Sequence, residues 1–171
     1  MPTIEVYHTQ ERRTQKLYSP ILAEGLEQWL GDGYYFWQDL DFAHWWGQTK
    51  KCKFPINKYT IFVSQICINE ENFIDTVFNE QDYYNFVKNI EKFARLYERK
   101  HKHKPTLEEF NDFIVDHNIW GEIKIIRFQD IPENNDLVMV NGLYYKKRIQ
   151  IVIKDLDLIT NFAFLNDFCK K

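Results

Sequence analysis

Residues 29–37 read Trp29-Leu30-Gly31-Asp32-Gly33-Tyr34-Tyr35-Phe36-Trp37, a pair of glycines around an aspartate followed by a run of aromatic residues. Glycine and aspartate favour a turn, because glycine adopts backbone conformations that other residues avoid and aspartate bonds to its own backbone. An aromatic run is typical of a strand, where large side chains pack on a pleated surface. We therefore expect a turn at residues 30–33 and a short strand at residues 34–37.

The flanking sequence predicts further elements. Ile4, Val6 and His8 alternate with their neighbours, which indicates a first strand at residues 3–9. The pair Ser19-Pro20 predicts a short helix that runs to residue 26. Asp39 or Asp41 is expected to cap a helix through residue 46, and residues 59–67 have the β-branched and aromatic content of a central strand.

The middle of the chain is predicted to be helical. Apolar residues follow helical spacing between residues 82 and 100, and Thr106 and Glu109 form a capping-box pattern before a second helix. Strands are expected again at residues 122–128, 137–140, 143–145, 148–153 and 158–160, with a hairpin turn at Asn141-Gly142. This order predicts one α+β domain over residues 1–171, with a mostly antiparallel or split sheet and a helical insertion at about residues 81–118.

Composition limits the class of protein. The chain has 171 residues, 44% hydrophobic and 27% charged, which is typical of a single globular domain. Its 3 cysteines are widely spaced, so we expect a reducing, cytoplasmic setting without a disulfide scaffold or a metal. No signal sequence or membrane span is expected. A net charge of -3 gives no overall attraction for nucleic acid, although basic runs at residues 50–53 and 99–104 can form local patches.

Three segments carry residues suited to chemistry. Val6-Tyr7-His8-Thr9 ends the first strand, Gly33-Tyr34-Tyr35 begins the aromatic strand with Asp41-Phe42-Ala43-His44-Trp45 after it, and Arg148-Ile149-Gln150-Ile151 lies on a late strand. In this order they resemble the His-Tyr-Glu signature of the ADP-ribosyltransferase superfamily, in its polymerase-like branch. The resemblance covers these motifs and not continuous sequence, and it implies a split antiparallel sheet.

The resemblance also implies NAD as co-substrate and a role for each residue. His8 would hydrogen-bond the ribose hydroxyl, and Thr9 would hold the nicotinamide amide through its backbone. Tyr35 would stack on nicotinamide. The nicotinamide ring would then lie between the Tyr35 ring and the turn at residues 31–33. Gly33, Tyr34 and Ala43 would lie beside the bound NAD, and no metal is implied.

Gln150 stands where the family carries its catalytic glutamate. When the nicotinamide bond breaks, positive charge develops on the ribose, and a carboxylate stabilises that state more than the ground state. Gln150 keeps a hydrogen bond to the 2'-hydroxyl and orients the acceptor, but it has no charge. Glu122 and Asp155 are candidates to compensate. Three explanations stay open: a variant active on a reactive acceptor, an NAD-binding protein with little turnover, or a Glu→Gln replacement made to silence an enzyme.

These residues predict transfer of ADP-ribose from NAD to a macromolecular acceptor, either a protein or a nucleic acid. The compact size resembles bacterial ADP-ribosylating toxins of toxin-antitoxin or phage-defence systems, which implies an antitoxin or immunity protein as a further partner. The helices at residues 81–118 would shape the acceptor surface. One alternative is a module of the same fold that binds NAD, ADP-ribose or a partner without turnover. The other is an unrelated interaction domain in which Tyr35 is sealed in the core.

Overall fold

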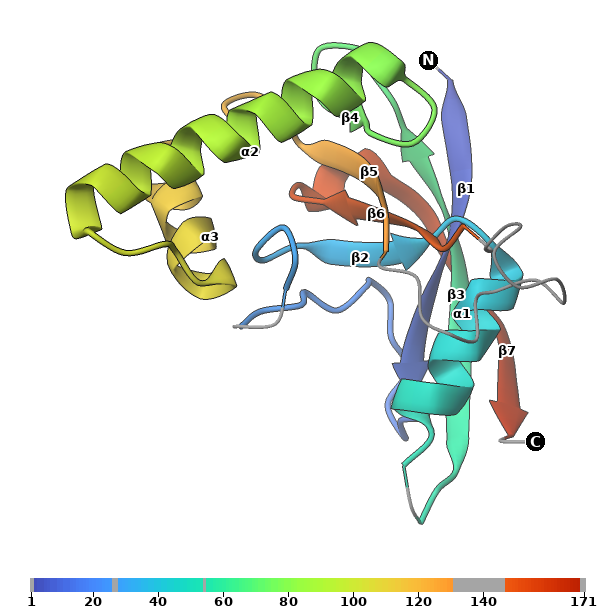
Figure 1. Cartoon of the computed structure of the whole chain (residues 1–171). Coiled ribbons are helices and arrows are strands. Elements are labelled where there is room, and N and C mark those ends of the chain that lie inside the picture. Colours follow the sequence, from blue (N-terminus) through green and yellow to red (C-terminus); the bar gives the residue numbers. More distant parts are fainter. Residues whose placement is uncertain (1, 26–27, 54, 131–146, 170–171) are drawn as a thin grey trace, which may run out of the picture.

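The computed structural model describes residues 2–25, 28–53, 55–130 and 147–169. These residues form a mixed α+β fold with a 7-stranded sheet in the order β4-β5-β6-β2-β1-β3-β7 (Figure 1). The strands are β1 (Thr3–Glu11), β2 (Tyr34–Trp37), β3 (Lys58–Cys67), β4 (Phe73–Asp75), β5 (Ile125–Gln129), β6 (Ile149–Ile153) and β7 (Ile159–Cys169). Neighbouring strands are antiparallel except β4 and β5, which are parallel.

The sheet consists of two halves that meet at β1 and β2. β1 pairs with β3 along its whole length, and β2 does the same with β6. Between β1 and β2, however, the described residues form a single register pair, Tyr7 with Trp37. Figure 1 shows β2, β5 and β6 running across the direction of β1, β3 and β7. The two strands therefore separate directly beyond this pair.

Apolar residues from both halves form the largest core cluster. It contains Val6, Phe36, Ile66, Ile125, Ile151 and Ile153. A second cluster, on the other face of β5 and β6, packs Val152 and Phe128 against Phe86 and Trp120 from the helical region. A third cluster packs Ala43 against Trp37 and Tyr59. The hydrophobic periodicity of the strands thus produces burial on both faces of the sheet.

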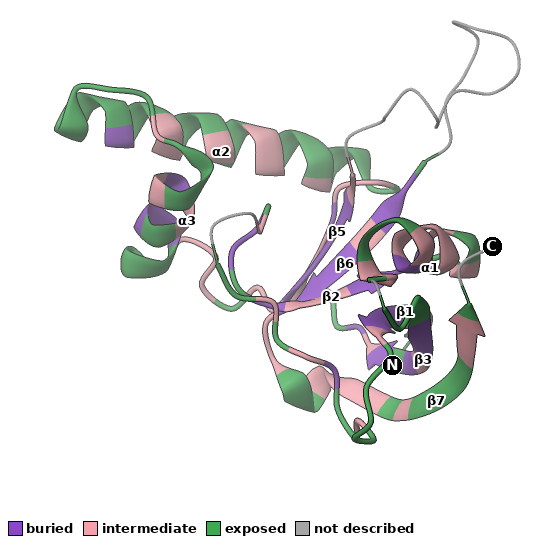
Figure 2. Ribbon diagram, turned by 90° about the horizontal axis from the view of Figure 1, so that it is seen from below, coloured by how far each residue is buried: buried purple, intermediate pink, exposed green. Residues whose placement is uncertain are grey.

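The helices are α1 (Leu40–Trp46), α2 (Glu80–His101) and α3 (Leu107–Asp116), with a π-helix at Gly47–Lys51 and a 3-10 helix at Leu156–Leu158. The capping box of Thr106 and Glu109 is confirmed. Asp39 precedes α1, but its side chain makes no capping hydrogen bond. α2 has one buried residue, Tyr97, and is otherwise largely exposed (Figure 2). None of the helices described has the length and apolar character needed to cross a bilayer.

The sheet differs from the sequence prediction at several places. The helix expected from Ser19-Pro20 is wrong, because residues 19–25 are not helical and Ala23 instead exchanges two backbone hydrogen bonds with Gly33, at 2.9 and 3.1 Å. β4 was not predicted, and β7 extends far past the expected residues 158–160. The strands expected at 137–140 and 143–145, with the turn at Asn141-Gly142, lie outside the described residues.

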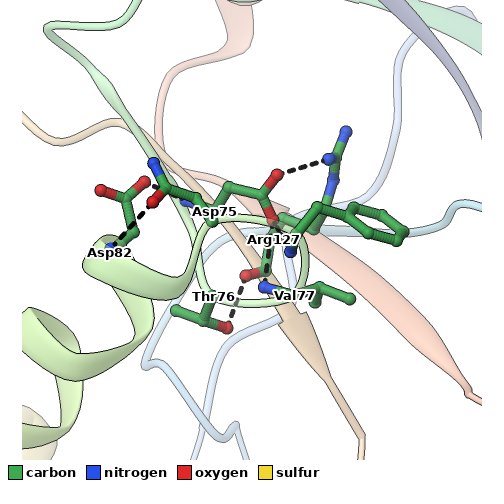
Figure 3. Close-up of polar contacts among 7 residues, drawn as sticks. Asp75, Thr76, Val77, Asp82 and Arg127 are labelled. Atoms are coloured by element: carbon green, nitrogen blue, oxygen red, sulfur yellow. Dashed lines mark hydrogen bonds and ion pairs between the residues drawn. The ribbon is translucent and has the colours of Figure 1, made fainter.

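A buried ion pair joins β4 to β5 and to the start of α2 (Figure 3). Arg127 Nη1 lies 2.7 Å from Asp75 Oδ2, and both residues are buried. The other carboxylate oxygen of Asp75 accepts hydrogen bonds from the backbone N–H groups of Val77 and Phe78. Asp75 N–H donates to the carboxylate of Asp82 in the first turn of α2. This network fixes where α2 leaves the sheet.

Candidate functional site

A cavity of about 470 Å³ lies where β1 and β2 separate. His8, Tyr35 and Gln150 all line it, and they come from the adjacent strands β1, β2 and β6. Residues 21–24, 28 and 29 form another part of its wall. The three residues that the sequence singled out are therefore brought to one cavity, although they are far apart in the chain.

His8 bridges the gap between the separating strands. Its Nδ1 lies 3.0 Å from the carbonyl oxygen of Tyr35, which can only accept, so Nδ1 carries the proton. The lone pair of Nε2 then accepts from the side-chain amide of Gln10 at 3.1 Å and from Ile21 N–H at 3.3 Å. Burial lowers the pKa of His8 to about 4. The imidazole is thus neutral at physiological pH, with Nε2 oriented as an acceptor.

Thr9 presents its backbone to the cavity. Arg12 N–H donates to Lys58 O at 3.1 Å, in register with the pairing of β1 and β3. Because an antiparallel ladder alternates its hydrogen-bonding side, Tyr7 and Thr9 direct their N–H and C=O groups toward β2 instead. Tyr7 pairs with Trp37 of β2, whereas Thr9 pairs with no residue of β2 among the residues described. The Thr9 hydroxyl donates to Ala43 O at 3.0 Å and is engaged.

The hydroxyl of Tyr35 is hydrogen-bonded to the glycine turn that precedes β2. It donates to Gly31 O at 2.7 Å and accepts from Leu30 N–H at 3.2 Å. Burial raises the pKa of Tyr35 to about 12, so the hydroxyl remains a donor. Gly31 and Asp32 line a different cavity, of about 640 Å³, on the side of α3. The Tyr35 hydroxyl is thus in direct contact with the turn, and the seat of nicotinamide between Tyr35 and this turn stays a prediction.

The other expected cofactor-binding residues lie beside the cavity and are not part of its described lining. A Cβ at Gly33 would lie 2.5 Å from Val152 Cγ2, so this glycine allows β2 to approach β6. Tyr34 packs against the core cluster on the opposite face of β2. Ala43 is fully buried beneath β1 and contributes only its carbonyl oxygen, which holds Thr9.

Gln150 shares the cavity with a carboxylate that the sequence did not single out. Gln150 is opposite Trp37 on β2 and Phe128 on β5, so these side chains share one face of the sheet. Asp130, two residues beyond Phe128, also lines the cavity and lies 3.3 Å from Arg148 Nη2. Glu122 and Asp155, the carboxylates expected to compensate for Gln150, are not among the described lining residues. Residues two apart in a strand lie on the same face, so the pairing of Phe128 with Gln150 places residues 128, 130, 148 and 150 on one face. This alternation is the sequence signal that could have identified Asp130.

Aromatic and charged side chains complete the lining. Trp29, Trp37 and Trp46 supply flat apolar surfaces. The cationic groups in the wall include Arg13, which lies 3.1 Å from Glu11, and Lys51. Burial lowers the pKa of Lys51, while Glu11 acts in the opposite direction. The cavity thus combines stacking surfaces, a neutral imidazole and exposed strand backbone with both cations and carboxylates, a mixture suited to a ligand with flat rings and several hydrogen-bonding groups.

Comparisons with protein-family models, with curated proteins and with solved structures give no match to this chain.

Proposed function

We propose that this chain binds NAD in the cavity of His8, Tyr35 and Gln150 and transfers ADP-ribose to a macromolecular acceptor. The observation that carries the proposal is the convergence of these three residues, from three adjacent strands, on one cavity at the separation of β1 and β2. Their order in the chain is that of the His-Tyr-Glu signature, and the sheet turns sharply at the same point. The proposed setting is a cytoplasmic bacterial toxin or phage-defence effector with an antitoxin or immunity partner.

The groups around His8 match those of a nicotinamide riboside. The carboxamide of nicotinamide has one acceptor and one donor side, which complement the N–H and C=O groups that Thr9 directs into the cavity. A ribose hydroxyl would donate to Nε2 of His8 in place of the Gln10 amide at 3.1 Å and of Ile21 N–H at 3.3 Å. Binding therefore requires the Gln10 side chain and the chain at Ile21 to move. Aromatic rings in the lining, above all Tyr35, are available to stack on the nicotinamide ring, and Arg13 and Lys51 are available to the phosphates.

The proposed reaction breaks the bond between nicotinamide and the ribose, and the bonding electrons leave with nicotinamide. Gln150 holds the 2'-hydroxyl, and the acceptor's nucleophilic atom forms the new bond to the same ribose carbon. The acceptor then loses its proton to a base. Gln150 cannot take this proton, whereas the carboxylates that line the cavity, including Asp130, can.

A second function, NAD binding without turnover, is favoured by one observation. Gln150 supplies no charge to a developing cation, and the carboxylate of Asp130 is already paired with Arg148 at 3.3 Å. This version predicts NAD affinity without nicotinamide release.

The test of transfer uses NAD labelled on the adenylate phosphate, incubated with the purified protein and a bacterial lysate. We expect label to move into protein or nucleic acid with the wild type, and to be reduced at least tenfold in His8→Gln, because the Nε2 acceptor is lost. His103→Gln makes the same exchange at an exposed position outside the cavity and should match the wild type. Equal labelling by wild type and His8→Gln, with unchanged thermal stability, would contradict the assignment.

A further inference from the structure

The exposed face of α2 carries an unusual row of cations. Lys88, Lys92, Arg95 and Arg99 are separated by four, three and four positions, so a helix of about 3.6 residues per turn places them on one face. All four residues are exposed. The row spans eleven rises of about 1.5 Å, or roughly 17 Å in all. We call these four residues the α2 cation row.

The opposite face of α2 holds the helix to the molecule. Phe86 stacks on Trp120 with ring centroids 5.4 Å apart, and Tyr97 packs on Phe113 of α3 at 5.7 Å. Figure 1 shows the C-terminal part of α2 extending beyond the sheet, with α3 beneath it. The cation row therefore lies on the outer side of a helix whose apolar side is already in contact with the domain.

The row is weakly neutralised by its neighbours. Among the described residues, Arg95 forms an ion pair with Glu91 at 3.9 Å, and both side chains are more than half exposed, at 73% and 65%. Exposed pairs of this kind contribute little. The four cations, together with Glu91 and Leu96, line an open hollow of about 440 Å³. The whole chain has a net charge of -3, so this positive surface is a local feature and not a reflection of overall composition.

From this arrangement we propose that the α2 cation row binds the phosphate backbone of a nucleic acid. Phosphate contacts require only accessible Lys and Arg side chains, and a straight row of cations matches the regular charge of a polynucleotide. Protein partners generally need a buried apolar centre, and Leu96 is the one apolar residue that lines this hollow among those described. The charge pattern thus favours a nucleic acid over an acidic protein. This binding does not depend on NAD.

The test measures fluorescence anisotropy of labelled single-stranded and double-stranded oligonucleotides with the full chain, without NAD, over a series of salt concentrations. A variant with Lys88, Lys92, Arg95 and Arg99 all replaced by Gln should bind at least tenfold more weakly. If all four cations contact phosphates of a duplex, the slope of log K against log salt should become shallower by about 3 to 4. Gln keeps the helix propensity, so thermal stability should be unchanged.

The matched control replaces Arg12, Lys16, Lys58 and Lys147 by Gln, which removes the same charge from four exposed residues outside α2 and outside the basic runs at residues 50–53 and 99–104. This control should bind as the wild type does. Equal weakening in both variants would overturn the proposal, because it would show an effect of net charge alone. Displacement of the oligonucleotide by polyglutamate at equal charge concentration would also overturn it, in favour of an acidic protein. Because NAD is absent, either result leaves the proposed transferase untouched.

Discussion

Replacing Gln150 by Glu is expected to accelerate nicotinamide release from NAD by up to about a thousandfold. A unit charge about 4 Å from the developing positive charge, at an effective dielectric near 20, contributes about 4 kcal/mol. If this energy acts only in the transition state, it corresponds to roughly three powers of ten in rate. Gln150 lines the cavity on β6, and the nearby carboxylate of Asp130 is paired with Arg148. The new carboxylate would therefore supply a negative charge at position 150, where Gln150 has none.

The measurement is nicotinamide released per minute under saturating NAD, for wild type and Gln150→Glu. Gln65→Glu is the matched control, since it places the same exchange on an exposed position of β3 outside the described lining of the cavity. That control should leave the rate unchanged, and Gln150→Leu should reduce it. A Gln150→Glu rate equal to that of the wild type would show that position 150 does not face the reacting ribose.

Breaking the buried pair of Asp75 and Arg127 is expected to lower the free energy of unfolding by about 3 to 5 kcal/mol. Asp75→Ala leaves the guanidinium buried without its partner at 2.7 Å, and it removes the acceptor for two backbone N–H groups at Val77 and Phe78. Arg127 already has a buried Nε with no hydrogen-bond partner in the described structure, so it has little means to compensate. The ion pair and the hydrogen bonds that Asp75→Ala removes lie where β4, β5 and α2 join.

Urea denaturation followed by far-UV circular dichroism measures this effect. The double variant Asp75→Ala with Arg127→Met should recover much of the loss, because it removes the unpaired charge as well. Glu91→Ala breaks an exposed pair on α2 and should change the free energy of unfolding by less than about 1 kcal/mol. A loss of that small size for Asp75→Ala would mean that solvent reaches the pair and that it does not fix the position of α2.

The strongly patterned elements could be predicted from the sequence. The apolar spacing of α2, the capping box of Thr106 and Glu109, and the β-branched run of β3 all act locally, and each element is found where it was expected. The glycine turn and aromatic strand of residues 30–37 also formed as predicted. In each case the local signal and the tertiary packing agree.

Elements that depend on distant partners could not be predicted in the same way. Ser19 and Pro20 are typical of a helix start, but the chain after them is not helical. Ala23 exchanges backbone hydrogen bonds with Gly33 instead. β4 is three residues long, which is too short for a clear alternating pattern. It pairs in parallel with β5, so no hairpin turn in the sequence indicates it. β7 is mostly exposed or half-buried and contains register shifts against β3, which removes the alternation that identifies a strand.

The candidate site was predictable as a set of motifs but not as a geometry. His8, Tyr35 and Gln150 line one cavity, yet the role of His8 in satisfying the carbonyl of Tyr35 depends on where β1 and β2 separate. The position of Asp130 beside Gln150 can be inferred only when the pairing of β5 with β6 is known. Ala43 and Gly33 are each in close contact with a neighbouring strand, which the motifs did not indicate.

Calorimetric titration of NAD into the wild type and into His8→Gln tests most directly whether this cavity holds NAD. The account predicts one binding site in the wild type and an affinity at least tenfold lower in His8→Gln. Because the pKa of His8 is about 4, wild-type affinity should stay level from pH 8 to 6 and fall as the pH approaches 4, where protonated Nε2 no longer accepts a hydroxyl. Absence of binding to the folded wild type, or equal affinity in His8→Gln, would contradict the account.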